Sequence, residues 1–162
     1  MQMRKKIDKC LEAVLVFLMA FLVLDVLWQV LSRYVLVSPS SFTDELAGFL
    51  LVWVGLLGAA YVAGRNEHLA IDLLLNHLKE ERKRCLLQLF IYAVTILFAV
   101  IVLIVGGSWL VYTRFYLDVT SASLQINLGY VYLVLPLSGV LTLYYAVDNM
   151  VLLVRKETNP AK

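Results

Sequence analysis

Four long apolar segments constrain this chain more than any other feature. They cover residues 11–31, 46–64, 86–113 and 128–154. The hydrocarbon core of a bilayer is about 30 Å thick, and a helix needs about 20 consecutive apolar residues to cross it. Because 62% of the residues are hydrophobic and 16% are charged, the chain has too few polar side chains to cover its surface in water. We therefore predict an all-α integral membrane protein with four crossings, forming a single membrane domain over residues 1–162.

The distribution of basic residues predicts the orientation. Lys and Arg side chains resist translocation and stay on the cytoplasmic side. Of the 14 basic residues, twelve lie before the first crossing, between the second and third, or in the C-terminal tail. Arg33 and Arg114 are the two in the remaining loops. We expect both termini to be cytoplasmic, with the first crossing retained because it contains Asp25 and no signal-peptide cleavage pattern follows it.

The segment between the second and third crossings, about 66–84, has a periodicity of its own. Its apolar residues fall on one face of a helical wheel, opposite a polar face. The apolar residues are Ala70, Ile71, Leu74, Leu75 and Leu78. This pattern predicts a short helix in the inner membrane interface, with a helical extension of a neighbouring crossing as the alternative.

Asp25 is the one ionisable residue that clearly lies inside a predicted crossing. Such residues are costly in hydrocarbon and mark function or a protein contact. Gln29 lies one turn further on the same face. An interhelical or intersubunit hydrogen bond is the favoured reading, and ion binding or contact with interfacial water are the alternatives.

The second crossing carries small residues at helical spacing, Gly55, Gly58 and Ala59. Gly55 and Ala59 form a small-x3-small pair, which allows two helix backbones to approach closely. We predict that this face packs against another helix, in this chain or in a partner subunit.

Residue patterns for enzymatic chemistry are missing from the sequence. His68 and His77 would point in opposite directions on a helix, and Cys10 and Cys85 form no Cys-x-x-Cys pair. We expect no catalytic residues, no metal, no cofactor and no nucleic-acid partner.

The first outer loop brings charges together. Arg33 ends the first crossing as Asp44 and Glu45 begin the second. We predict an ion pair between Arg33 and Glu45 that fixes this helical hairpin, with contact between Arg33 and lipid phosphates as the alternative.

Five short blocks, in this order, resemble the small membrane subunit of the tripartite ATP-independent periplasmic (TRAP) transporters. They are Arg33-Tyr34, Phe42-Thr-Asp-Glu45-Leu46, Trp53-x-Gly55-Leu-Leu-Gly58-Ala59, Arg65-Asn-Glu-His68-Leu-Ala-Ile-Asp72 and Leu135-Pro136-Leu-Ser-Gly139. The resemblance extends from about residue 5 to 154, and the block from Glu45 to Asp72 is the most specific part.

The resemblance implies a transporter subunit of the bacterial inner membrane that is surrounded by lipid and performs no chemical reaction. Its partners would be a larger, elevator-type membrane subunit and, transiently, a periplasmic substrate-binding protein that delivers an organic acid for sodium-coupled uptake. Asp25, Gln29, Gly55, Gly58 and Ala59 would contact or support the larger subunit. The candidates for the outer docking surface are Arg33, Ser40, Phe42, Asp44, Glu45 and Arg114.

Two other classes share the four-crossing pattern. One is a small homo-oligomeric exporter, in which Asp25 would couple transport to protons. The other is a membrane anchor for a redox or assembly complex. The sequence does not identify the transported acid.

The charge distribution gives a direct test of orientation. A cysteine introduced at Ser40 should react with a membrane-impermeant thiol reagent in intact spheroplasts, and a cysteine introduced at Glu80 should not. Reaction at Glu80 with protection at Ser40 would reverse the assignment.

Overall fold

A computed structural model describes residues 2–35, 41–65 and 81–158. Its elements are α1 (Gln2–Tyr34), α2 (Ser41–Arg65), α4 (Glu81–Phe98), the π-helix η1 (Ala99–Gly106), α5 (Gly107–Tyr116), α6 (Leu128–Tyr132) and α7 (Val134–Thr158). Ser40, His68, His77 and most of the predicted interfacial segment, 66–80, lie outside the described residues.

Within the described ranges, four helical stretches are long and apolar enough to cross a membrane, which confirms the predicted all-α, four-crossing fold. They are Arg4–Tyr34, Ser41–Arg65, Cys85–Tyr116 and Leu128–Val154. Each of the four apolar segments in the sequence lies inside one of these stretches. Large apolar side chains such as Phe17, Leu24 and Leu97 are exposed on the outside, as a chain dissolved in lipid requires.

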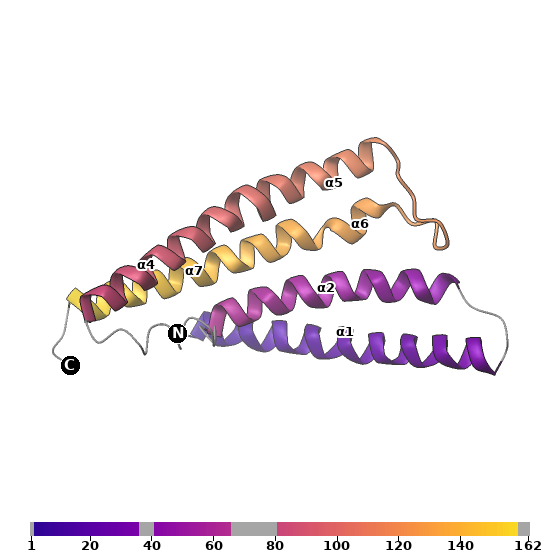
Figure 1. Ribbon diagram of the computed structural model, residues 1–162, viewed down its shortest axis with the longest axis horizontal. Coiled ribbons are helices and arrows are strands. Elements are labelled where there is room, and N and C mark those ends of the chain that lie inside the picture. Colours follow the sequence, from indigo (N-terminus) through magenta and orange to yellow (C-terminus); the bar gives the residue numbers. More distant parts are fainter. Residues whose placement is uncertain (1, 36–40, 66–80, 159–162) are drawn as a thin grey trace.

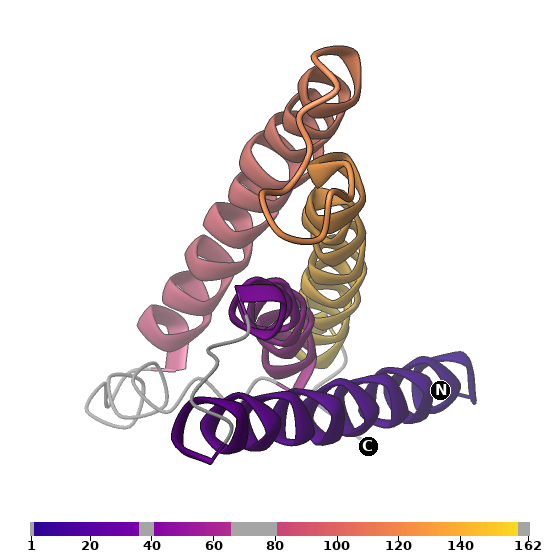
Figure 2. The same ribbon diagram turned by 90° about the vertical axis from the view of Figure 1, so that its right-hand side faces the viewer.

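The crossings form two antiparallel hairpins, α1–α2 and α4–η1–α5 with α6–α7 (Figure 1). Viewed end-on, α2 lies in the middle of the assembly (Figure 2). It packs against both α1 and α7, while α4 and η1 pack on α7 and α5 packs on α6. We call the end that carries Val35 and residues 117–127 the loop end, and the opposite end, near both termini, the terminus end.

The α1–α2 hairpin is joined along a seam with coiled-coil spacing. Buried or half-buried residues of α1 recur at alternating intervals of four and three: Leu11, Leu15, Leu18, Leu22, Asp25, Gln29 and Ser32. The facing residues of α2 follow the same intervals: Thr43, Ala47, Leu50, Val54, Leu57 and Tyr61. A repeat of 3.5 residues keeps each side chain facing the partner helix along the whole seam.

A second face of α2 packs on α7 around Tyr145, which is fully buried. A Cβ atom at Gly64 would lie 2.8–2.9 Å from the Tyr145 ring, so glycine is needed for this approach. Further along α2, the indole nitrogen of Trp53 donates to the Val131 carbonyl at 3.1 Å. These contacts connect the two hairpins at two depths.

The two irregular helical regions meet in the second hairpin. Pro136 has no N–H to offer the carbonyl of Tyr132, and the helix breaks at Leu133 between α6 and α7. Close by, a Cβ atom at Gly107 would lie 2.8 Å from Leu135 Cβ.

Gly139 of α7 provides a stability test of this contact. A Cβ atom at Gly139 would lie 2.7 Å from Leu103 Cβ and 3.2 Å from the Ile104 backbone nitrogen, and both atoms are fixed by the η1 backbone. Gly139→Ala should therefore lower the unfolding free energy of the purified chain by about 1–3 kcal/mol through overpacking.

The matched control is Gly48→Ala, since a Cβ atom there meets nothing within 4 Å. That change should leave stability unaltered or raise it by about 0.5–1 kcal/mol, the usual gain of Ala over Gly in a helix. Thermal unfolding in detergent followed by circular dichroism compares the two. Equal stability of both variants would contradict the close packing of α7 on η1.

Candidate interaction surfaces

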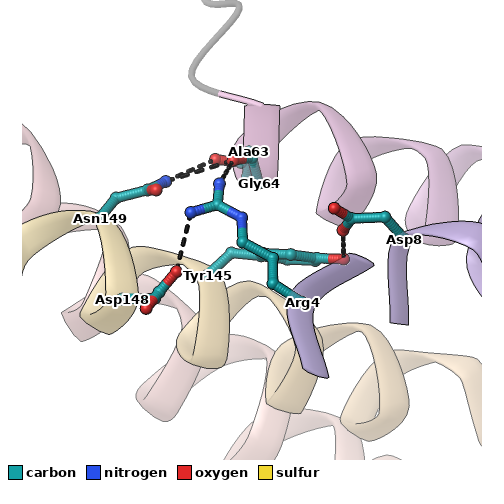
Figure 3. A network of polar contacts seen from close by, with 7 residues as sticks. All are labelled: Arg4, Asp8, Ala63, Gly64, Tyr145, Asp148 and Asn149. Atoms are coloured by element: carbon teal, nitrogen blue, oxygen red, sulfur yellow. Dashed lines mark hydrogen bonds and ion pairs between the residues drawn. The ribbon is translucent and has the colours of Figure 1, made fainter. Parts of the chain in front are cut away.

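At the terminus end, a polar network joins α1, α2 and α7 (Figure 3). The Arg4 guanidinium of α1 donates to Asp148 of α7 at 2.7 Å and to the Gly64 carbonyl of α2. The Tyr145 hydroxyl of α7 donates to Asp8 of α1. A single arginine thus connects three helices at the level where the membrane interface is expected.

Asn149 extends this network to the C-terminal turn of α2. Its amide nitrogen donates to the Ala63 and Gly64 carbonyls at 3.3 and 3.4 Å. The last carbonyls of a helix have no partner within the helix, and a cation nearby also suits the helix dipole. Arg4 and Asn149 therefore cap α2, and they do so from two other helices.

A second ion pair, also near the terminus end, joins α1 and α2. Arg65 donates to Glu12 at 2.9 Å, and the Tyr61 hydroxyl donates to the same carboxylate. The Arg65 guanidinium also lies over the Tyr61 ring, 4.8 Å from its centroid. Because both charged side chains are about half exposed, this pair contributes about 0–1 kcal/mol.

At the loop end, the predicted pair between Arg33 and Glu45 is wrong. Arg33 and Glu45 take part in neither of the two ion pairs described above, Arg4–Asp148 and Arg65–Glu12. The Glu45 carboxylate instead accepts three backbone N–H groups, from Ala122 at 3.0 Å, Ser123 at 2.8 Å and Leu124 at 3.0 Å. Arg33 is exposed, and α1 and α2 are joined here by a hydrogen bond from Gln29 to Asp44.

The loop that Glu45 binds, residues 117–127, has a defined fold. The Asn127 amide donates to Asp118 at 3.0 Å, and its oxygen accepts from the Gly129 N–H at 2.8 Å, capping α6. Thr120 and Asn127 form a β-bridge, and Asp118 and Gln125 adopt positive φ angles of 46° and 52°. Two residues in the left-handed region give the chain the tight reversal it needs here.

The remaining docking candidates are scattered over the loop end. Phe42 and Asp44 are exposed on the first turn of α2. Arg114 is half-buried, with its guanidinium 5.8 Å from the centroid of the Tyr132 ring. The structure thus brings Glu45 to residues 122–124 but keeps Arg114 in a contact within its own hairpin.

Asp25 lies in the α1–α2 seam and is 8% exposed. One of its carboxylate oxygens has no hydrogen-bond partner among the described residues. The interhelical hydrogen bond expected of this stripe is made by Gln29, one turn away, inside the chain.

A third face of α2 is not covered by the described part of the chain. We call it the open face; it consists of Gly48, Val52, Gly55, Ala59 and Val62, all exposed. A Cβ atom at Gly48, Gly55 or Gly58 would meet nothing within 4 Å, although Gly58 is half-buried. The open face repeats the four-and-three spacing of the α1 seam, which is the spacing of a helix–helix contact.

Over residues 2–35, 41–65 and 81–158, no set of three or more His, Cys, Asp or Glu side chains lies close enough together to hold a metal ion. Cys10 is exposed and Cys85 is half-buried, and neither forms a disulfide.

Sequence reasoning missed the network around Arg4, and a signal for it was present. Arg4 and Asp8 continue the four-and-three spacing of the α1 seam backwards from Leu11. Following that register would have placed both side chains on the face of α1 that packs against α2. The Glu45 contact had no such signal, because its partners are backbone groups 77–79 residues away.

Comparisons with known proteins give a consistent result. Residues 22–156 match the family model described as tripartite ATP-independent periplasmic transporters, DctQ component. The chain is 34% identical over 102 residues to the sialic acid TRAP transporter small permease protein SiaQ of Vibrio cholerae, covering 62% of this chain and 59% of SiaQ. It is 30% identical over 98 residues to the C4-dicarboxylate TRAP transporter small permease protein DctQ of Rhodobacter capsulatus, covering 60% and 42%.

A longer relative contains a similar segment. The sialic acid TRAP transporter permease protein SiaT of Haemophilus influenzae is 37% identical over 73 residues, which are 43% of this chain and 12% of SiaT. In each of these relatives the match spans less than two thirds of the relative's length.

Proposed function

The chain belongs to the family of DctQ components of TRAP transporters, and we propose that it supports a larger permease subunit during binding-protein-dependent uptake of an organic acid. The family match to residues 22–156 carries this proposal and agrees with the resemblance seen in the sequence. Membership makes the chain a small permease subunit of a transporter and not an enzyme. A position in the bacterial inner membrane, with both termini in the cytoplasm, completes the proposal.

The open face of α2 is the proposed contact with the larger subunit. Lipid provides no hydrophobic drive for helix association, so helices associate where small residues let their backbones approach. Gly48, Gly55 and Ala59 offer such an approach on the outside of the chain. The SiaT relative supports a lasting association, since the segment similar to this chain is 12% of a longer permease polypeptide.

The transported substrate is proposed to bind elsewhere. A carboxylate crossing the membrane needs compensating positive groups. Asp25, the ionisable group in the α1–α2 seam, is itself acidic, and Arg4 and Arg65 are engaged with Asp148 and Glu12 at the terminus end. Two relatives are named for sialic acid and for C4-dicarboxylates, both of which are carboxylic acids. We therefore propose an organic acid as the substrate, sodium as the coupling ion, and the larger subunit and binding protein as its binding sites.

The exporter alternative is disfavoured by the position of Asp25. A coupling acid must exchange protons with water on each side in turn. Asp25 is 8% exposed and occupies a position of the α1 seam register. The seam register thus explains the residue without a transport cycle.

The uptake assay tests the proposal directly. The chain is reconstituted in proteoliposomes together with the large permease subunit, a sodium gradient and the binding protein. These proteoliposomes should accumulate the organic acid, whereas proteoliposomes that contain this chain alone should not. Specific uptake by the chain alone would reject the supporting role.

Association through the open face predicts a second result. Ala59→Leu, and more strongly Gly55→Leu, should reduce co-purification of the large subunit several-fold because the added side chain separates the helices. Ala20→Leu is the matched control, since Ala20 is also exposed but lies on α1. Unchanged co-purification for both α2 variants would remove the open face from the interface.

A further inference from the structure

Glu45 makes the most concentrated polar contact at the loop end. Its two carboxylate oxygens accept the N–H groups of three consecutive residues, Ala122, Ser123 and Leu124, at 2.8–3.0 Å. Successive backbone N–H groups that converge in this way form an anion-binding nest. Here the anion is a side chain of the other hairpin, so the contact joins the start of α2 to the loop before α6.

The contact determines where the loop lies. Residues 117–127 descend from α5 and pass over the start of α2 (Figure 1, Figure 2). The internal bonds of the loop, from Asn127 to Asp118 and Gly129, shape it within its own hairpin. The bonds to Glu45 fix that shape relative to α2.

A composite surface results from this placement. Phe42 lies one turn before Glu45 on α2 and is 50% exposed, and Ile126 lies two residues after Leu124 and is 43% exposed. Both apolar side chains belong to the segments that Glu45 joins. The twelve-to-two distribution of basic residues predicts that this end faces the periplasm.

We propose that Glu45 is a positioning residue that holds residues 121–126 over the first turn of α2, so that the loop and Phe42 together receive the periplasmic binding protein. This inference rests on the proposed function as a TRAP small subunit. A loop that is already ordered loses less conformational freedom when a partner docks, so the clamp lowers the concentration of binding protein that uptake requires.

Glu45→Gln tests the clamp, and Asp44→Asn is its matched control. A carboxamide has one acceptor oxygen and places its own N–H₂ donors against the three N–H groups, so it cannot replace the carboxylate. Asp44 is the adjacent residue, loses the same charge in its variant, and bonds to Gln29 instead of the loop. The two variants therefore separate the clamp from the general loss of an acid at this end.

Two measurements on the complex with the large subunit read out the effect. A spin label on Ala122→Cys, with Cys10 and Cys85 replaced by Ser, reports loop mobility by electron paramagnetic resonance. Uptake into proteoliposomes, measured against the concentration of binding protein, gives a half-saturating concentration and a maximum rate. Glu45→Gln should mobilise the label and raise the half-saturating concentration about 5- to 20-fold. It should leave the maximum rate within twofold and should not reduce co-purification of the large subunit. Asp44→Asn should leave the spin label immobile, because the bonds to residues 122–124 come from Glu45.

Each contrary outcome has a distinct meaning. An immobile label in Glu45→Gln would overturn the clamp. A mobile label with an unchanged half-saturating concentration would overturn its role in docking. Loss of co-purification would place Glu45 in the large-subunit interface and overturn the proposal in that way. If the wild-type complex shows no uptake that depends on the binding protein, the proposed function fails, and the docking role fails with it, whatever the label shows.

Discussion

The central position of α2 is the constraint on which the rest of the structure depends. A helix surrounded by lipid gains nothing by hiding apolar side chains, so its position must come from close contact and from hydrogen bonds. On one face, α2 meets α1 along a seam of 3.5-residue period. On another face, Gly64 receives the ring of Tyr145 and Trp53 donates to Val131. The two hairpins pack against each other mainly through α2, and Arg4 and Asp8 of α1 add direct polar contacts to α7.

Polar side chains lie at the two ends of α2, where removing them from water costs less free energy than it does in the middle of the bilayer. Arg4 and Asn149 bind the last carbonyls of α2 at the terminus end, and Gln29 and the loop of residues 122–124 bind its first acids at the other. Arg4 and Gln29 join α2 to the two ends of α1, Asn149 joins it to α7, and residues 122–124 join it to the loop before α6. Asp25 is the exception, a carboxyl group inside the seam with one oxygen unpartnered among the described residues.

The fold could be predicted from the sequence because its determinants are local. Apolar length gives a crossing, and Pro136 breaks its helix wherever the helix packs. The partner of Glu45 could not be predicted in the same way. Chain proximity favoured Arg33, but a carboxylate is satisfied equally well by backbone N–H groups, and those of residues 122–124 arrive only when the second hairpin has packed against α2. The Arg4 network could be predicted in part. The spacing of Arg4 and Asp8 places them in the α1 seam, but the sequence does not show which residues of α2 and α7 they bind.

The glycines of α2 lie on two kinds of surface, one packed inside the chain and one open to its surroundings. Gly64 has a reason inside the chain, because any side chain there would collide with Tyr145. Gly48 and Gly55 have no such reason in the described structure, since a Cβ atom at either meets nothing within 4 Å. Each glycine in a helix interior costs about 0.5–1 kcal/mol relative to alanine, so the two positions together forgo about 1–2 kcal/mol of helix stability. A helix of another subunit, packed backbone to backbone along Gly48, Gly55 and Ala59, would offset that cost, and lipid would not, because lipid fills the space beside alanine as well as beside glycine.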